Sequence, residues 1–166
     1  AGLRDRGEQR PGHWLGDAAP PAPPRVRLHA SYAGPVWNGD PALYPLGLLL
    51  ERPLGYAEGS GANQPWLRTL RPRPDAGPWS FAARVHPSSV TGIRDGDEVV
   101  LASEHGAITI RVRLDERLVP GYVVVPMGAG HDAYGRWAEG FGANPLALVG
   151  QGALLATRVR MRRGAP

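Results

Sequence analysis

The sequence GAITIRVRL at residues 106–114 decides the fold class of this chain. Aliphatic residues alternate there with polar ones at every second position, which is the period of a β-strand with one buried face. The aliphatic side is formed by Ile108, Ile110, Val112 and Leu114, and the polar side by Thr109, Arg111 and Arg113. This pattern predicts a strand in the half-solvated wall of a barrel.

Further strand candidates lie on both sides of this stretch. Near the C-terminus, at 155–163, Leu155, Thr157, Val159 and Met161 oppose Arg158, Arg160 and Arg162. The sequence GYVVVP at 121–126 is too apolar for a wet face and predicts a central strand. Shorter candidates bounded by turn residues occur at 44–51, 81–86 and 98–103, and one helical turn is expected within 87–93. At least six short strands without a long segment of helical period predict a mainly β fold, either a closed barrel or a sandwich.

The chain divides into two predicted parts. Residues 1–40 hold a Pro/Ala tract and predict an extended linker or tail, on which Trp14, Tyr32 and Trp37 are candidates for docking on a neighbouring surface. Residues 41–166 carry the strand pattern and form the predicted domain. No window is apolar enough for a membrane span, and no signal-peptide core is present. The lack of an initiator Met favours a processed product or a piece of a longer protein.

Charge and composition limit the partners. All 19 basic residues are arginine, and the net charge is +4 with a pI near 10.1. A GC-rich genome is the simple explanation for the missing lysine, but arginine is always charged and its planar fork matches phosphate oxygens. An anionic partner is therefore expected, and nucleic acid, an acidic protein face and a phosphorylated cofactor all qualify. The absence of cysteine excludes disulfides, thiolate metal sites and Cys-ligated iron–sulfur clusters within this sequence.

A loop that combines glycines with large rings follows the predicted central strand, in VVVPMGAGHDAYGRWAEGFGANPLAL at 123–148. Glycine lets the backbone approach a ligand closely. Aromatic, arginine and asparagine side chains can then stack on the ligand and form hydrogen bonds with it. The loop therefore predicts a surface that wraps a flat, polar molecule. The alternative is a packed surface loop that is tied down by its own side chains.

No independent catalytic set is visible. The five histidines lack the spacing of a metal site. Ser103, Glu104 and His105 are neighbours in sequence and do not indicate a catalytic triad. The carboxylates at 95–98 belong to a turn built on Asp-Gly. Neither a Walker A motif nor a GxGxxG fingerprint is present.

Several short motifs follow one another in an order typical of one family. They are LLLER at 48–52, NQPWL at 63–67, VHPSSVTGIRDGDEV at 85–99, SEHGAITIRVRL at 103–114, VPGYVVVP at 119–126 and GAGHDAYGRWAEGFGANP at 128–145. In this order they resemble the C-terminal dinucleotide-binding domain of the molybdopterin oxidoreductases, the dimethyl sulfoxide reductase superfamily. The resemblance covers about residues 41–163. The loop is most similar to the branch that contains polysulfide-reductase-like enzymes and the related subunit of alternative complex III.

The resemblance implies a double-psi β-barrel of about six strands with short helices. It also implies that the domain covers one side of a molybdopterin guanine dinucleotide (bis-MGD, with molybdenum or tungsten), which complex III-type members have lost. The implied cofactor-binding residues are Arg52, Asn63, Gly128, Gly130, His131, Tyr134, Gly135, Arg136 and Asn144. Catalytic residues, metal ligands and iron–sulfur clusters are expected in other domains, so this segment is not catalytic by itself.

Plain structural interpretations stand beside these roles. Arg52 can cap a strand end in solvent, and Asn144 with the following proline can be a turn that breaks the chain. Tyr134 and Trp137 can be stacking platforms or core plugs, and for Trp137 the core plug is favoured. The sequence departs from the family pattern at Glu51, which places a carboxylate beside the expected phosphate site.

Three functions follow from these patterns. The first is a cofactor-binding barrel of a multidomain or split molybdoenzyme. Its expected partners are a catalytic molybdopterin domain or subunit, an iron–sulfur subunit and, as a further candidate, a membrane anchor subunit. The second is a cofactor-free structural barrel in a respiratory membrane complex. The third is an Arg-rich barrel that binds nucleic acid, although no stack of aromatics accompanies its arginines. The branch implies the periplasmic side of the inner membrane, with the cytoplasm as the alternative.

Overall fold

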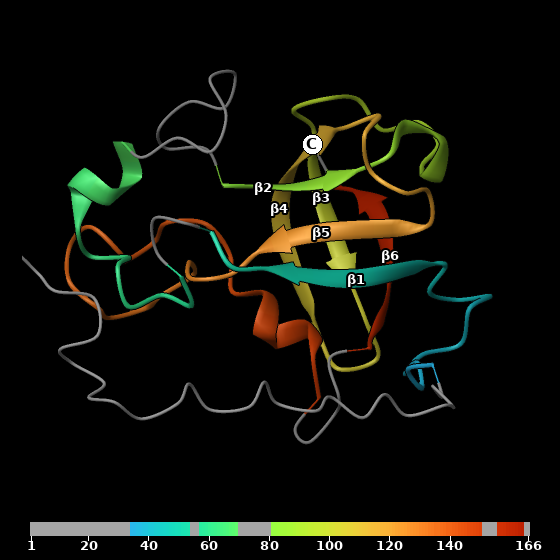
Figure 1. Cartoon of the computed structure of the whole chain (residues 1–166), viewed down its shortest axis with the longest axis horizontal. Coiled ribbons are helices and arrows are strands. Elements are labelled where there is room, and N and C mark those ends of the chain that lie inside the picture. Colours follow the sequence, from blue (N-terminus) through green and yellow to red (C-terminus); the bar gives the residue numbers. More distant parts are fainter. Residues whose placement is uncertain (1–33, 54–56, 70–80, 151–155, 165–166) are drawn as a thin grey trace, which may run out of the picture. The chain divides into compact units, whose positions relative to one another are not determined.

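The computed structural model describes residues 34–53, 57–69, 81–150 and 156–164 (Figure 1). These residues belong almost entirely to the second of two compact units, Pro35–Pro166. The predicted docking residues Trp14 and Tyr32, and Leu155 of the last predicted strand, lie outside the described ranges.

In the described ranges, six short strands form a closed barrel in the order β1-β5-β2-β4-β3-β6. Their bounds are β1 Leu46–Glu51, β2 Ala82–Val85, β3 Glu98–Ala102, β4 Ala107–Leu114, β5 Tyr122–Pro126 and β6 Arg158–Arg163. The helices of the same ranges are short 3₁₀ turns: η1 Pro65–Thr69, η2 Pro87–Ser89 and η3 Pro145–Leu148. The prediction of a mainly β fold with about six strands and short helices is therefore confirmed.

The sheet is mixed, and its parallel pairs position the candidate site. β1 runs parallel to β5, with Gly47 opposite Tyr122 and Glu51 opposite Pro126. β2 runs parallel to β4, and the other neighbours are antiparallel. Parallel neighbours end at the same edge of a sheet. The segments that follow β1 and β5 therefore leave the barrel side by side, as the teal and orange arrows of Figure 1 show.

The core is aliphatic and follows the predicted alternation. Ile108, Ile110 and Val112 are buried on β4, whereas Thr109 and Arg111 between them are exposed. On β5 the three successive valines 123–125 are all buried, which confirms a central position between β1 and β2. Phe81 and His86, which were expected within one strand, flank the shorter β2, because His86 caps η2 through the Ser88 N–H.

Arginines of β6 lie on aromatic rings rather than in open solvent. The Arg158 guanidinium carbon lies 5.3 Å from the centroid of the Trp37 ring, and that of Arg160 lies 5.6 Å from the Tyr44 ring. Trp37 in turn contacts Tyr122, with 6.0 Å between the ring centroids. Cation–π contact and apolar cover for the arginine stems explain why both side chains are half-buried.

Residues just before the predicted domain boundary at residue 40 contact the barrel. Asn38 forms a bridge with Thr157, and its N–H donates to the Ala156 carbonyl at 2.8 Å. A Cβ on Gly47 would lie 2.9 Å from the Trp37 ring, so glycine makes this ring contact possible. The division at residue 40 stays a prediction, because most of its N-terminal side falls outside the described residues.

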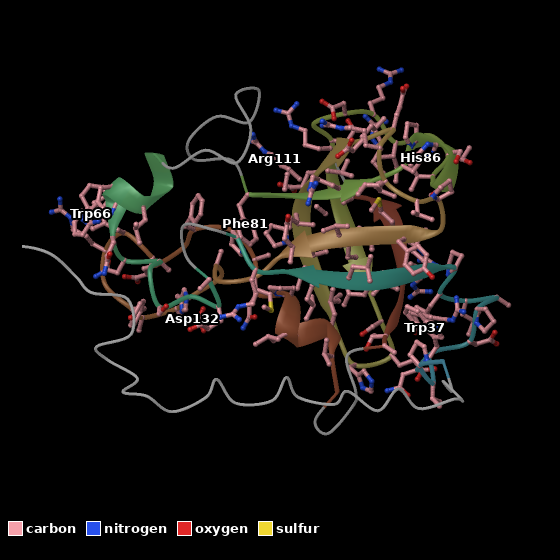
Figure 2. The ribbon with its side chains drawn as sticks, viewed as in Figure 1. Trp37, Trp66, Phe81, His86, Arg111 and Asp132 are labelled. Carbon is pink, nitrogen blue, oxygen red and sulfur yellow. The ribbon has the colours of Figure 1, made fainter. Side chains whose placement is uncertain are left out.

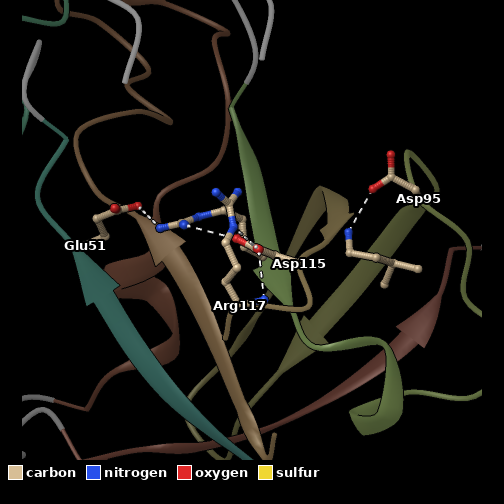
Figure 3. A network of polar contacts seen from close by, with 6 residues as sticks. Glu51, Asp95, Asp115 and Arg117 are labelled. Carbon is tan, nitrogen blue, oxygen red and sulfur yellow. Dashed lines mark hydrogen bonds and ion pairs between the residues drawn. The ribbon is translucent and has the colours of Figure 1, made fainter. Parts of the chain in front are cut away.

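An ion network joins the end of β1 to the connection after β4 (Figure 3). Arg84 on β2 donates to Glu51 at 2.7 Å and lies 3.6 Å from Asp115. The buried Asp115 also accepts from Arg117 at 3.0 Å. Because β5 lies between β1 and β2, Arg84 spans the central strand and fixes the last residue of β1.

Thr157→Val is expected to stabilise the protein by about 1 kcal/mol, because a buried hydroxyl without a hydrogen bond is costly. Thr157 is 1% exposed, and its Oγ1 has no partner among the described residues. Valine has nearly the same shape and favours strands. Chemical denaturation should show the gain, whereas the control Thr109→Val, at an exposed site on β4, should change stability little. A loss of stability in Thr157→Val would show that the hydroxyl has a partner.

Candidate functional site

Two segments meet at the end of the barrel where β1 and β5 stop. Residues 57–67 follow β1, and residues 127–148 follow β5; Trp66 and Asp132 mark them in Figure 2. The Met127 N–H donates to the Glu51 carbonyl at 2.8 Å, which continues the pairing of the two strands. Farther out, the Tyr134 hydroxyl donates to the Ser60 carbonyl at 3.3 Å. The two segments therefore form one joint structure, although they are distant in sequence.

Two loop glycines make close packing possible, Gly128 against the segment after β1 and Gly130 within the loop itself. Gly128 has a φ of +92°, and a Cβ there would lie 2.9 Å from the Gly59 nitrogen. Gly130 has a φ of +76°, and a Cβ would lie 2.5 Å from the carbonyl carbon of Ala143. The predicted role of these glycines was to bring N–H groups to a ligand. In the structure, they bring the backbone against the chain itself, which fits the alternative of a loop that is tied down internally.

His131 faces into the joint between the segments. Its ring lies 5.2 Å from the Tyr134 ring, and its Nε2 is buried without a hydrogen-bond partner in the described part of the chain. A Cβ on Gly59 would lie 3.0 Å from Nε2, so this glycine covers the imidazole. A bridge with Glu139 holds the His131 backbone.

The aromatic residues of the loop are exposed. Tyr134 is 46% and Trp137 is 38% exposed, so the interpretation of both as core plugs is wrong. The reason is that small side chains already fill the inner side of the loop, namely Ala129 and Ala138, which are buried. The Arg136 guanidinium lies over the Trp137 ring, 4.4 Å from its centroid. Both exposed rings can stack on a flat partner, with one cation beside them.

Arg52 carries a partner that the sequence did not reveal. Its guanidinium donates to the Glu58 carboxylate at 2.9 Å, with both side chains more than half exposed. This hydrogen bond is the main reason why the pKa of Glu58 is lowered from its ordinary value. Glu51, whose charge was the expected conflict with a phosphate, is held by Arg84 instead. The carboxylate that competes with a phosphate for Arg52 is therefore Glu58.

Asn144 forms the turn that was one of its two interpretations. Its Oδ1 accepts from the Leu146 N–H at 3.1 Å and caps η3, with Pro145 at the first helical position. The side-chain NH₂ donates to none of the described residues, and the residue is exposed. The cap and a role in binding are thus compatible.

The loop also presents backbone donors. The N–H groups of residues 132–136 donate to no acceptor within the described ranges. Together with Arg136 and the Asn144 amide, they form a surface rich in donors and cations. Such a surface suits phosphate oxygens, because amides and guanidinium groups both donate to them.

Ser103 supports the far end of the loop. Its buried hydroxyl donates to the Leu148 carbonyl at 2.7 Å and accepts from the His105 N–H at 3.0 Å. These bonds fix η3 against the turn between β3 and β4. The observed bonds give Ser103 a structural role. Among the described residues, no group of three or more His, Asp or Glu side chains could hold a metal ion, and no helix is long and apolar enough to cross a membrane.

The arginines that motivate the nucleic-acid hypothesis, Arg111, Arg113, Arg158, Arg160 and Arg162, do not share one environment. Arg113 pairs with Asp95 at 2.7 Å, and Arg158 and Arg160 lie on rings. Exposed positions remain at Arg111 on β4 and Arg162 on β6. The cations do not form one continuous free face, and the structure adds no support for nucleic acid.

A groove of about 590 Å³ runs along β4 beside the loop. Phe81 and Phe141 form one part of its wall, with 5.9 Å between their ring centroids, and Gly142 adjoins them. Acidic and basic side chains of β3, β4 and the turn before β3 line the remainder, namely Asp95, Glu98, Arg111 and Arg113. Because their charges balance, the groove by itself does not select an anion.

Comparisons with known proteins show which proteins this chain is similar to. The model of the family described as "Molydopterin dinucleotide binding domain" matches residues 52–151, more than half of the chain. The chain is 35% identical over 121 residues to the arsenate respiratory reductase molybdopterin-containing subunit ArrA of Shewanella sp. (strain ANA-3), covering 69% of this chain and 14% of that protein. ArrA of Chrysiogenes arsenatis is 31% identical over 109 residues, covering 63% of this chain and 13% of that protein.

Two further similarities are more distant. Over 58 residues the chain is 34% identical to the menaquinone reductase, molybdopterin-binding-like subunit, of Nitratidesulfovibrio vulgaris (strain Hildenborough), covering 35% of this chain and 8% of that protein. The solved structure of acetylene hydratase from Pelobacter acetylenicus superposes with a TM-score of 0.52 at 19% identity, covering 73% of this chain and 18% of that one. This likeness concerns the fold. The chain spans no more than 14% of the length of these sequence relatives.

Proposed function

This chain belongs to the molybdopterin dinucleotide-binding domain family, and from that premise we propose that it binds the guanine dinucleotide end of a molybdopterin cofactor within a larger oxidoreductase. The observation that carries the proposal is the surface of loop 128–145. Arg136, the exposed rings and the backbone N–H groups of residues 132–136, which donate to none of the described residues, lie together at one end of the barrel.

The residues present fit a ligand of this kind. A dinucleotide has a pyrophosphate, for which Arg136 and the amides of 132–136 supply donors, and a fused heterocycle, for which Tyr134 and Trp137 supply ring faces. Asn144 offers its NH₂ group, which donates to no residue in the part of the chain that the structure describes. Arg52 would join them by exchanging the Glu58 carboxylate for a phosphate. The buried Nε2 of His131 has no hydrogen-bond partner among the described residues and so favours a polar ligand here, since buried polar atoms normally have a partner.

The remaining chemistry is proposed to come from other parts of the enzyme. A bis-MGD cofactor would supply a redox-active molybdenum or tungsten centre, whereas the residues of this chain bind and orient the dinucleotide and exclude water from one side. The small share of the relatives' length that the chain covers supports a catalytic molybdopterin domain or subunit as its partner. The same proposal includes two further partners, an iron–sulfur subunit and a membrane anchor subunit. It also places the chain in the polysulfide-reductase-like or alternative complex III branch and on the periplasmic side of the inner membrane.

Titration of the full chain with GDP tests the proposal, because GDP reproduces the guanine, the ribose and the pyrophosphate. We expect GDP to bind more tightly than ADP, and Arg136→Gln to weaken binding roughly tenfold, as the loss of one charge-assisted hydrogen bond does. Arg162→Gln removes an exposed arginine of β6 and serves as the control. Absence of GDP binding, or an equal loss in both variants, would contradict the proposal.

A cofactor-free structural barrel is the second candidate function. It is favoured by one observation: Gly128 and Gly130 pack against the chain itself, so the loop is ordered by internal contacts. Purification of the chain with its native partners distinguishes the two functions. A complex that releases guanine nucleotide and a pterin on acid treatment supports cofactor binding. A well-folded complex without pterin, molybdenum or tungsten supports the scaffold.

A further inference from the structure

Asn63 lies where the two segments at the end of the barrel are tied together. It belongs to the segment after β1, just before η1, and it is only partly exposed. Its Oδ1 accepts a hydrogen bond from the Trp137 N–H at 3.1 Å, across 74 positions of sequence. A side-chain carbonyl therefore fixes the backbone of the loop at one of its two exposed rings.

The opposite side of the loop is shaped to receive this side chain. Gly135 has a φ of +93°, and a Cβ there would lie 2.6 Å from Cγ and 2.7 Å from Oδ1 of Asn63. Real Cβ atoms do not come so close. The Asn63 amide thus fills the space that the absent Cβ of Gly135 leaves, and it accepts a hydrogen bond from the loop backbone at Trp137.

We propose that Asn63 is a positioning residue that holds Tyr134, Arg136 and Trp137 in their outward arrangement, and that it does not itself contact the dinucleotide. Tyr134 and Arg136 flank Gly135, and Trp137 carries the N–H that Asn63 accepts, so all three depend on this one side chain. The consequence for binding rests on the proposed function, whereas the effect on loop geometry does not.

Hydrogen exchange at the Trp137 amide, followed by NMR in the full chain without ligand, reports the geometry directly. Asn63→Ala removes the acceptor and should speed exchange roughly two- to tenfold, the range that one net hydrogen bond gives. Asn63→Asp keeps an acceptor oxygen and should retain protection. Gln64→Ala, at the exposed neighbouring position, should leave the rate unchanged.

A pair of glycine variants tests the same contact from the loop side. Gly135→Ala should speed exchange at Trp137 as Asn63→Ala does, because the new methyl group displaces the asparagine. Gly140 also has a positive φ, +66°, but a Cβ added there would have no heavy atom within 4 Å. Gly140→Ala therefore reports backbone strain without the clash, and it should affect Trp137 much less.

GDP affinity of the same variants completes the experiment. The proposal expects weaker GDP binding in Asn63→Ala and Gly135→Ala, in step with faster exchange. Unchanged exchange at Trp137 together with weaker GDP binding would mean that Asn63 contacts the ligand. Faster exchange with unchanged GDP binding would mean that Asn63 matters only for structure. Either result overturns the proposal. If the wild-type chain binds no GDP, the proposed function fails, and exchange at Trp137 alone decides whether Asn63 holds the loop. Should Asn63→Ala unfold, Gly135→Ala and Asn63→Asp carry the test.

Discussion

Gly130→Ala is expected to weaken GDP binding by more than about tenfold, because the substitution breaks the closure of the loop. Alanine at a φ of +76° costs roughly 1–2 kcal/mol. The methyl group would also lie 2.5 Å from the Ala143 carbonyl carbon and 2.9 Å from the Asn144 Cα. These neighbours are backbone atoms, which cannot rotate away. The hydrogen bond from the Gly130 N–H to the Phe141 carbonyl, 2.8 Å long, would be lost with the shift.

Calorimetric titration with GDP measures this effect, and near-ultraviolet circular dichroism of the tryptophans reports the loop. The control is Gly96→Ala. Gly96 has a φ of +85°, but a Cβ added there would have no heavy atom within 4 Å. Both variants carry the strain of a left-handed residue, and only Gly130→Ala carries the clash. Equal effects in the two variants would show that the close approach of the loop segments is unimportant.

Leu101→Ala is expected to lower the free energy of unfolding by about 2–5 kcal/mol, the cost of a cavity in a packed core. Leu101 is fully buried on β3, between Ile108 on β4 and Met161 on β6. The closed barrel leaves the surrounding strands little freedom to collapse into the space. Urea denaturation measures the loss, with Leu49→Ala as the control.

Leu49 lies on the outer face of β1 and is 44% exposed, so its truncation removes much less buried surface. We expect the control to cost well under half as much as Leu101→Ala. If the two losses were similar, the assignment of inner and outer faces to these strands would be wrong.

Strand identity could be predicted because side-chain alternation is a local signal. The Ile108–Val112 stretch shows it on β4, and the valines of β5 show burial on both faces. The ends of strands were harder to predict. His86 caps a 3₁₀ turn, and Thr157 pairs with Asn38 outside the named strands. These events depend on neighbours that the local pattern does not contain.

The candidate site was predictable as a region but not in its contacts. The glycines, rings and polar residues of 128–145 marked the loop, whereas several of their partners, namely Gly59, Ser60 and Asn63, come from 57–67. They meet only because β1 and β5 are parallel neighbours, which the sequence alone does not state. The Asn63–Trp137 bond therefore could not be read from spacing. The Arg52–Glu58 pair lies within the segment after β1, at a separation of six positions that neither the helix period nor the strand period predicts. The exposed side of Trp137 was missed for a related reason, because small alanines of the same loop fill the interior.

The closed ladder has a consequence for the evolution of the chain. Each of the six described strands pairs with two others, so none of them is an edge strand with one side open along its whole length. Open edges invite intermolecular β pairing and aggregation. A domain without open edges can be joined to, or separated from, a much larger polypeptide without exposing unpaired backbone N–H and C=O groups. Sequence changes can then occur mainly in the two segments at the end of the barrel, 57–67 and 127–148, while the six strands stay the same.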